Sequence, residues 1–242
     1  MAWNHSGRWT AWVGALVLAI VGSTFAPTLA LGVSTGTFNI DGTLTISGTA
    51  PQIRFEADQP PFTANKAQVG ATGATGSFAG IAGTTVSIQN VSNPPAVTGG
   101  AGFPPQSFLS FDAMPGLGTL QLNFVFAGVN PSAPCALAPA VGQACALPGS
   151  PFDFQNTPGG GSRLGFVVSG ISNPAGSTWV GSFSSQFMVP YQIVFATLEG
   201  GGTVTSTYSA SFNVVVPEPT SLALVLGGLG ILVGVSRRRT PH

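Results

Sequence analysis

Glu56 and Asp58 are an acidic pair whose spacing could support chemistry. They lie two residues apart, so in an extended strand both point to the same face, roughly 6–7 Å from each other. That separation is compatible with glycoside hydrolysis by two carboxylates or with a calcium site. Alternation with Phe55 and Ala57 equally places them on the solvent face of a strand. We expect this second, non-catalytic arrangement, because no calcium-loop pattern of spaced Asp and Asn residues is present.

Histidine occurs only near the two ends of the chain, at His5 and His242. The region between them therefore has no Ser-His-Asp or Cys-His arrangement, and it lacks the usual ligand for zinc or copper. Lys66 is the only lysine, so a Ser/Lys pair could use no other residue. We expect a protein that is not an enzyme and that holds no metal or other cofactor.

The two cysteines, Cys135 and Cys145, lie in one loop rich in proline and alanine, residues 130–151. In an oxidising compartment we expect them to pair. Closing a loop of about 11 residues would stabilise the fold by roughly 2–3 kcal/mol in the chain-entropy model. Their spacing is not that of a zinc knuckle and no second ligand pair exists, so a metal or redox role is not expected.

The segment Thr203–Val216 is predicted to be a strand whose inward face is formed by Val204, Tyr208, Ala210, Phe212, Val214 and Val216. Three threonines alternate from Thr203 to Thr207 and share the opposite face of this strand. Flat ladders of this kind are used by ice-binding proteins, although threonine is favoured on any exposed sheet face. Aromatic residues expected in or near loops could instead form a carbohydrate platform, but core packing is the expected use. These aromatic residues are Phe103, Phe152, Phe154 and Trp179.

The composition is poor in charge and rich in aromatic residues. Of the 242 residues only 6% are charged, whereas 44% are hydrophobic and 17 are phenylalanine. A disordered chain lacks such aromatic content. Between residues 31 and 216, three basic side chains face six acidic ones, for a formal charge of −3. Because there is no basic patch, nucleic acid is not an expected partner.

Period-two alternation, interrupted by many of the 34 glycines and 20 prolines, dominates residues 31–216. We expect an all-β domain there, a single antiparallel β-sandwich of about ten strands, with a barrel as the runner-up. Asp41–Gly42 is predicted to be a hairpin turn, and Tyr191–Glu199 a strand. In the segment Thr119–Val129 one buried face is predicted. Its members are Leu120, Leu122, Phe124 and Phe126.

Residues 1–30 have the pattern of a secretory signal peptide. Arg8 precedes an apolar segment, Val13–Val21, and the small residues near Ala30 suit cleavage. No arginine pair precedes the apolar segment, so the general Sec route is expected. The alternative is an uncleaved membrane anchor. Pro27 argues against it, because proline would end the helix just before the expected cleavage site after Ala30.

The C-terminal segment joins a proline motif, an apolar run and three arginines. Pro217 and Pro219 lack a backbone N–H, so the last strand must end before them. Residues 220–236 would form a helix of roughly 25 Å, just long enough to span a hydrocarbon core. The side chains expected in the membrane are Leu222, Leu224, Leu226, Leu229, Ile231, Val233 and Val235. The residues expected to hold this end in the cytoplasm are Arg237, Arg238 and Arg239.

This order of elements resembles the PEP-CTERM sorting signal, with Val216, Pro217, Glu218 and Pro219 as the motif. The resemblance implies that an integral-membrane protease, an exosortase, is a partner that cuts at or near the motif. It also implies an inner-membrane-anchored precursor, then a place at the cell surface or in the extracellular matrix, and an association with exopolysaccharide. The expected organisation is a signal peptide (1–30), a β-sandwich (31–216) and a sorting signal (217–242), so that a signal helix and a transmembrane helix flank the domain.

These observations predict an exported structural or adhesive protein of the cell envelope. One alternative is a polysaccharide-active hydrolase that uses Glu56 and Asp58. The other is a surface protein that binds carbohydrate or ice. Glycan binding and glycan cleavage, measured on the same protein, would separate the hydrolase from the other two.

Overall fold

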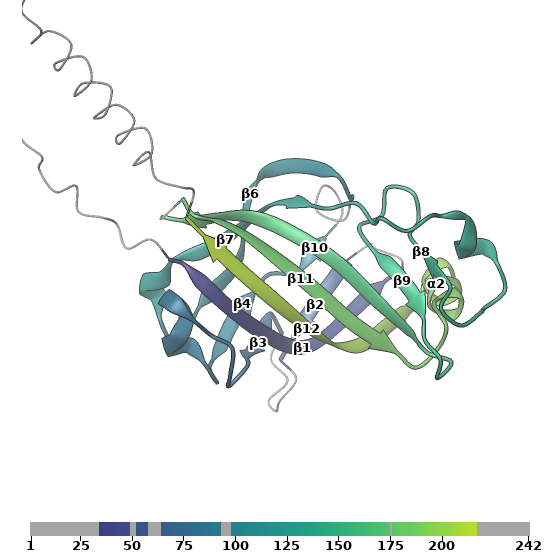
Figure 1. The fold of residues 1–242 in the computed structure, drawn as a ribbon, viewed down its shortest axis with the longest axis horizontal. Helices are drawn as coiled ribbons and strands as arrows, with labels where there is room; N and C mark the ends of the chain where they lie inside the picture. The colour runs from purple at the N-terminus through teal and green to yellow at the C-terminus, as the bar shows by residue number, and fades with distance from the viewer. Residues whose placement is uncertain (1–33, 49–51, 58–63, 93–97, 175, 217–242) are drawn as a thin grey trace, which may run out of the picture. The chain divides into compact units, whose positions relative to one another are not determined.

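The computed structural model describes residues 34–48, 52–57, 64–92, 98–174 and 176–216, which form one twelve-stranded sheet with short helical elements (Figure 1). The strands are β1 (Gly36–Ser47), β2 (Gln52–Glu56), β3 (Lys66–Val69), β4 (Thr85–Ile88), β5 (Val91–Ser92), β6 (Ala101–Phe111), β7 (Thr119–Val125), β8 (Ala144–Cys145), β9 (Asp153–Asn156), β10 (Ser162–Asn173), β11 (Thr178–Phe187) and β12 (Thr203–Val215). The helical elements are the 3₁₀ helices η1 (Gly76–Ile81), η2 (Pro115–Leu117) and η3 (Ala133–Ala136), and helix α2 (Tyr191–Glu199). The predicted signal peptide and the predicted sorting signal lie outside the described residues.

The sheet closes on itself as an antiparallel barrel. Its strands follow the order β11-β12-β1-β3-β4-β6-β7-β10, and β10 then pairs with β11, which completes a ring of eight. Strand β10 closes the ring because it pairs with β11 along one edge, from Ser162 to Ile171, and with β7 along the other. The remaining strands β2, β5, β8 and β9 extend the sheet outside this ring.

The all-β prediction is confirmed, but the predicted sandwich is wrong. In a sandwich the two sheets have separate edges, whereas here β11 joins β10 to β12 with paired strands on both sides. Alternation of apolar and polar residues is the same in both architectures. The strand pattern that predicts one therefore predicts the other, and only the pairing of β10 with β11 decides between them.

Aromatic side chains fill the barrel interior. Phe38 on β1 stacks on Phe212 on β12, with ring centroids 4.9 Å apart, and contacts Phe78 of η1 at 4.8 Å. On the neighbouring strands, Phe166 of β10 stacks on Phe183 of β11 at 4.6 Å, and Phe183 also meets Phe212 edge-on. An eight-stranded barrel is just wide enough for side chains to fill it. The high phenylalanine content of the sequence is thus used for core packing.

Strand β12 follows its predicted alternation. Tyr208, Ala210, Phe212 and Val214 are buried, and the residues between them, Ser209, Ser211 and Asn213, are exposed. The exception is Val216, predicted to point inward, which is 38% exposed just beyond the end of the strand.

The predicted turn at Asp41–Gly42 is wrong, because β1 runs through it without interruption and pairs with β12 along its whole length. Gly42 lies opposite Tyr208, and a Cβ atom there would collide with the Tyr208 ring and with the Glu56 carbonyl. The glycine is therefore required for close packing rather than for a turn.

The predicted single face of β7 is also wrong in its second half. Leu120 and Leu122 are buried, but Val125 replaces Phe124 as the next buried residue, and Phe126 is 42% exposed. The pairing of β7 with β10 slips between Leu122 and Phe124. Such a bulge adds a residue to one strand and reverses which side chains face inward.

Residues Tyr191–Glu199, predicted to be a strand, form the helix α2. Pro190 precedes the helix, and three glycines from Gly200 to Gly202 follow it, with the Gly200 N–H bonded to the Ala196 carbonyl. Proline at the start and glycine at the end are typical of helices. Tyr191 and Val194 are three residues apart and both buried, as one face of a helix requires.

The described chain enters and leaves the barrel at the same end, since Gly36 pairs with Val214. We call this the exit end. The opposite end, where Ser47 pairs with Thr203, carries α2, β8, β9 and the loop that contains η3 (Figure 1). We call it the α2 end. Among the described residues, no helix is long and apolar enough to cross a membrane.

Candidate functional site

The loop at the α2 end is closed by a disulfide between Cys135 and Cys145, whose Cα atoms are 5.3 Å apart. This confirms the predicted pairing. Cys145 is buried on β8 and pairs with Phe154 of β9, so the disulfide fastens the free part of the loop to the sheet. A disulfide stabilises the fold mainly because it restricts the unfolded chain.

The side chain of Gln192 on α2 ties the helix to this loop. Its Nε2 atom donates hydrogen bonds to the Leu137 carbonyl at 3.2 Å and to Gln143 Oε1 at 2.8 Å. Its Oε1 atom accepts a hydrogen bond of 3.1 Å from Asn156 Nδ2 on β9. One amide thus connects helix, loop and sheet.

Tyr191, next to Gln192, makes a second connection. Its side chain is fully buried, and its hydroxyl donates a hydrogen bond of 3.0 Å to the Pro134 carbonyl in η3. Burial raises the pKa of this hydroxyl above its ordinary value of 10.0. The ring packs beside Phe195, and Phe195 in turn meets Phe154 edge-on at 4.8 Å. The three rings of Tyr191, Phe195 and Phe154 form an aromatic cluster between the loop and the sheet.

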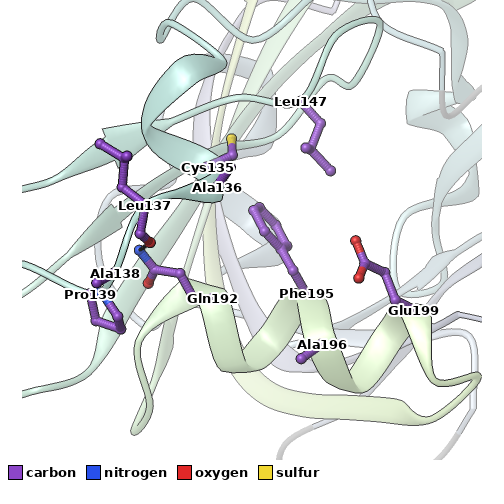
Figure 2. Close-up of a pocket in the computed structure, with 10 residues that line it drawn as sticks. All are labelled: Cys135, Ala136, Leu137, Ala138, Pro139, Leu147, Gln192, Phe195, Ala196 and Glu199. Atoms are coloured by element: carbon purple, nitrogen blue, oxygen red, sulfur yellow. Dashed lines mark hydrogen bonds between the residues drawn. The ribbon is translucent and has the colours of Figure 1, made fainter.

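Between α2 and the disulfide loop lies an open hollow of about 420 Å³ (Figure 2). Its walls are largely apolar, and Leu137 and Leu147 are 58% and 43% exposed there. Glu199 is the only ionisable side chain among the described residues that line it. Cys135 also lines the hollow, but its sulfur is bonded to Cys145. The arrangement can bind an apolar group, whereas acid–base or thiol chemistry needs partners that the lining does not offer.

Of the acidic pair considered from the sequence, the structure describes only Glu56. Glu56 ends β2, lies opposite Thr43 of β1 and forms an isolated bridge with Ala64. It is half-buried. Asp58 lies outside the described residues, so the pairing of the two carboxylates stays a prediction.

Lys66 takes part in an exposed ion pair. Its Nζ atom lies 2.7 Å from Asp112 Oδ2 and donates a second hydrogen bond to Ser87 Oγ. Ser87 in turn donates to Asp112 Oδ1 at 2.8 Å. The three side chains connect β3, β4 and the end of β6, which is a structural use of the only lysine.

The threonine ladder of β12 lies on the outer face of the barrel and continues onto β1. Thr205 lies opposite Thr45, with 3.0 Å between their hydroxyl oxygens, and Thr207 lies opposite Thr43. Two adjacent strands therefore present hydroxyl groups on one face. The sequence pattern indicated only one of them.

The aromatic residues considered for a carbohydrate platform pack into the core, as expected. Trp179 is 1% exposed and stacks on Phe108, and its indole N–H donates to the carbonyls of Gln121 and Ile171. Phe103 and Phe154 are buried, and Phe152 packs against the same core. In the part of the chain that the structure describes, no three His, Cys, Asp or Glu side chains gather as a metal site would require.

Residues 215–239 match the family model described as the PEP-CTERM protein-sorting motif. The chain therefore carries this motif, as its resemblance predicted. The match contains the motif residues Val216–Pro219 and the basic residues Arg237–Arg239. Comparison with curated proteins and with solved structures finds no significant match. The motif implies an exported protein that an exosortase processes and that is sorted to the cell surface.

Proposed function

We propose that this chain is a non-catalytic structural or adhesive protein of the cell surface, associated with exopolysaccharide. The observation that carries the proposal is the position of the sorting motif, which begins at residue 215, where β12 ends. The barrel precedes the motif, and in this proposal it crosses by the Sec route and stays on an inner-membrane-anchored precursor until an exosortase acts.

The difference between the two ends of the barrel supports this role. The described chain leaves the barrel at one end, where the matched motif begins at residue 215, and the hollow beside α2 lies at the other end. Strand β12 connects the two ends with 13 residues, about 40 Å at roughly 3.3 Å per residue. A partner at the α2 end would be bound well away from the point where the chain is anchored or transferred.

The proposal that the protein is not an enzyme is supported by the chemistry of the hollow. A nucleophile or general base acts with a second group that accepts or relays the proton. Glu199 has no such neighbour in the lining, and the region between the chain ends contains no histidine. An open hollow with apolar walls is suited to binding.

The test uses the protein as it is produced in cells that carry an exosortase and recovered from their surface. It is screened against polysaccharides for both retention and cleavage. Retention without new reducing ends supports the proposal. Cleavage that falls more than a hundredfold in a Glu56→Gln, Asp58→Asn double variant, with the fold unchanged, would replace it with the hydrolase.

The apolar hollow has its own test in an adhesion assay on these cells. Changing Leu137 and Leu147 to serine should reduce attachment, because both side chains are exposed in the hollow. Val180 is 44% exposed on the outer face of β11, and Val180→Ser is the matched control. Equal loss from the control would show that the hollow is not the contact surface.

The hydroxyl face of β1 and β12 favours a second candidate, a surface that binds ice or carbohydrate. Thr43, Thr45, Thr205 and Thr207 lie in two neighbouring rows about 4.8 Å apart. Thermal hysteresis of the purified protein tests ice binding. If it occurs, Thr205→Tyr should abolish it, because a bulky side chain interrupts a flat surface.

A further inference from the structure

A second hollow, of about 450 Å³, lies on the outer face of β9, β10 and β11 near the α2 end. Five of its nine lining residues have polar or charged side chains, against two of ten in the hollow beside α2. The five are Asn130, Asp153, Gln155, Arg163 and Ser184, and the other four are Ala144, Phe154, Leu164 and Gly165. Its volume falls within the range of about 300–1,000 Å³ that is usual for small-molecule sites.

Arg163 is the cation of this hollow, and it is available to a ligand. It lies on β10 between Gln155 of β9 and Gln186 of β11, so that a guanidinium is flanked by two amides across the strands. Its neighbours along the strand, Ser162 and Leu164, are buried, whereas Arg163 is exposed on the outer face. Within the described residues its side chain makes no hydrogen bond or ion pair. The other side-chain cations described differ in this respect, since Lys66 is paired with Asp112 and Arg54 also has an interaction.

Gly165 makes the space in front of Arg163. It lies two residues further along β10, on the same face, between Asp153 and Ser184. A Cβ atom at Gly165 would meet nothing closer than the Phe183 carbonyl, at 3.8 Å. The position therefore tolerates a side chain, and the hollow exists because the residue has none.

Asp153 lines one side of the hollow, and its carboxyl group is already hydrogen-bonded to the backbone. Its carboxylate accepts hydrogen bonds from the N–H of Val129, at 3.0 and 3.1 Å, and from the N–H of Asn130, at 2.8 Å. These contacts fix the loop that carries Asn130 against the barrel. The hollow therefore combines one cation without a partner among the described residues, Arg163, with one carboxyl group that the backbone already engages, and it suits a ligand of low charge.

We propose that this hollow binds the carboxylate of an acidic sugar, such as a uronic acid unit of a polysaccharide. The planar guanidinium of Arg163 matches a carboxylate through two parallel hydrogen bonds. The amide groups of Asn130 and Gln155 and the hydroxyl of Ser184 provide donors and acceptors for the ring hydroxyls. A doubly charged phosphate fits less well, because one arginine faces it and Asp153 repels it. The proposal rests on the proposed function at the cell surface and names the chemical class of its ligand.

The experiment measures binding of galacturonate, which carries a single carboxylate, and of its methyl ester to the purified full chain by titration calorimetry. The ester keeps the sugar hydroxyls but removes the charge. We expect the acid form to bind at least tenfold more tightly than the ester, as the loss of a charge-assisted pair implies. Arg163→Gln should weaken binding of the acid form by about tenfold or more, with little effect on the ester.

Two further variants separate the hollow from general effects of charge. Gly165→Val should block binding while the fold is retained, because a side chain has room there and valine suits a strand. Arg54→Gln, on the outer face of β2, removes the same charge elsewhere and should leave affinity unchanged.

The proposal would be overturned by equal affinity for acid and ester, by equal weakening in Arg54→Gln, or by tighter binding of a short peptide with a free terminal carboxylate than of the sugar. Absence of binding would also overturn it. The amount of protein at the cell surface, measured in parallel for wild type and Arg163→Gln, tests the proposed function separately and should be the same for both.

Discussion

The two ends of the barrel are stabilised by different kinds of interaction. At the exit end, Phe38 and Phe212 stack in the closed ring, with Phe78 of η1 packed beside them. At the α2 end, a disulfide and the hydrogen bonds of Gln192 hold a loop and a helix against the sheet. Apolar side chains are largely buried in the first region, whereas Leu137 and Leu147 are exposed in the second.

This difference separates anchoring from recognition. Core packing fixes the strands from which the sorting motif continues, and it allows little change in volume. Loops held on a rigid scaffold are where binding groups concentrate, because their side chains can differ without repacking the core. The hollow beside α2, which the disulfide loop lines on one side, follows this rule, whereas most residues of the second hollow lie on strands β9, β10 and β11. The two ends can therefore be altered separately.

The largest effect is expected from the sorting motif beyond the exit end. Glu218→Ala combined with Pro219→Ala should stop processing and leave the precursor in the membrane, because the apolar run is unchanged. Mass spectrometry of the C-terminus, in a host that carries an exosortase, should find wild-type protein shortened near Pro217. The double variant should still end at His242.

Replacing Arg237, Arg238 and Arg239 with glutamine is the matched comparison. It removes the charges that hold the helix end in the cytoplasm and should weaken retention before processing. If all surface-localised wild-type protein retained an intact His242, the segment would be an anchor without processing.

The second largest effect is expected in the core at the exit end. Phe38→Ala removes a fully buried ring and should lower the free energy of unfolding by about 3–5 kcal/mol, through lost burial and the cavity left behind. Urea denaturation measures the change. Phe126→Ala is the control, since Phe126 is 42% exposed, and should cost about 1 kcal/mol or less. Similar losses from both variants would contradict the core described here.

A smaller loss is expected from the disulfide. Changing Cys135 and Cys145 to alanine should lower the free energy of unfolding by about 2–3 kcal/mol, since the bond no longer restricts the unfolded chain. Hydrogen exchange should then increase at the α2 end while the strands at the exit end stay protected. Thiol labelling of the exported, unfolded wild type should modify neither cysteine, and labelling of both would disprove the bond in the exported protein.

Much of the barrel could be predicted from the sequence where local alternation decides the structure. The inward face of β12 from Tyr208 to Val214 is an example, since the alternation of apolar and polar residues along the chain predicts which side chains are buried. The bulge in β7 could not be predicted, because it depends on how Leu122 and Phe124 pair with β10. Ring closure likewise depends on pairing between strands that are far apart in sequence.

The sites differ in the same way. The disulfide could be predicted because the chain has two cysteines and a signal peptide that indicates export to an oxidising compartment. Arg163 could not, because its importance arises from Gln155 and Gln186 on the neighbouring strands and from the missing side chain of Gly165. Helix α2 was predictable in principle, since Pro190 before it and the glycines after it are boundary signals, but its β-branched and aromatic residues favour a strand.

The smallest effect is expected from the hydroxyl group of Tyr191. Tyr191→Phe removes one hydrogen bond, to the Pro134 carbonyl, and should lower the free energy of unfolding by about 1 kcal/mol at neutral pH.

Burial raises the pKa of Tyr191 in the folded protein, while the unfolded chain ionises near 10.0. Above that pH the unfolded state loses its proton first, so the stabilising contribution is complete below pH 10 and falls as the pH rises through the folded pKa. Urea midpoints between pH 8 and pH 11 should therefore decline less steeply in Tyr191→Phe than in the wild type. Gln192→Leu breaks neighbouring hydrogen bonds without removing an ionisable group, so it should lower stability and keep the wild-type slope. An unchanged slope in Tyr191→Phe would mean that Tyr191 is not buried, and that the loop and α2 are not packed together as the α2 end requires.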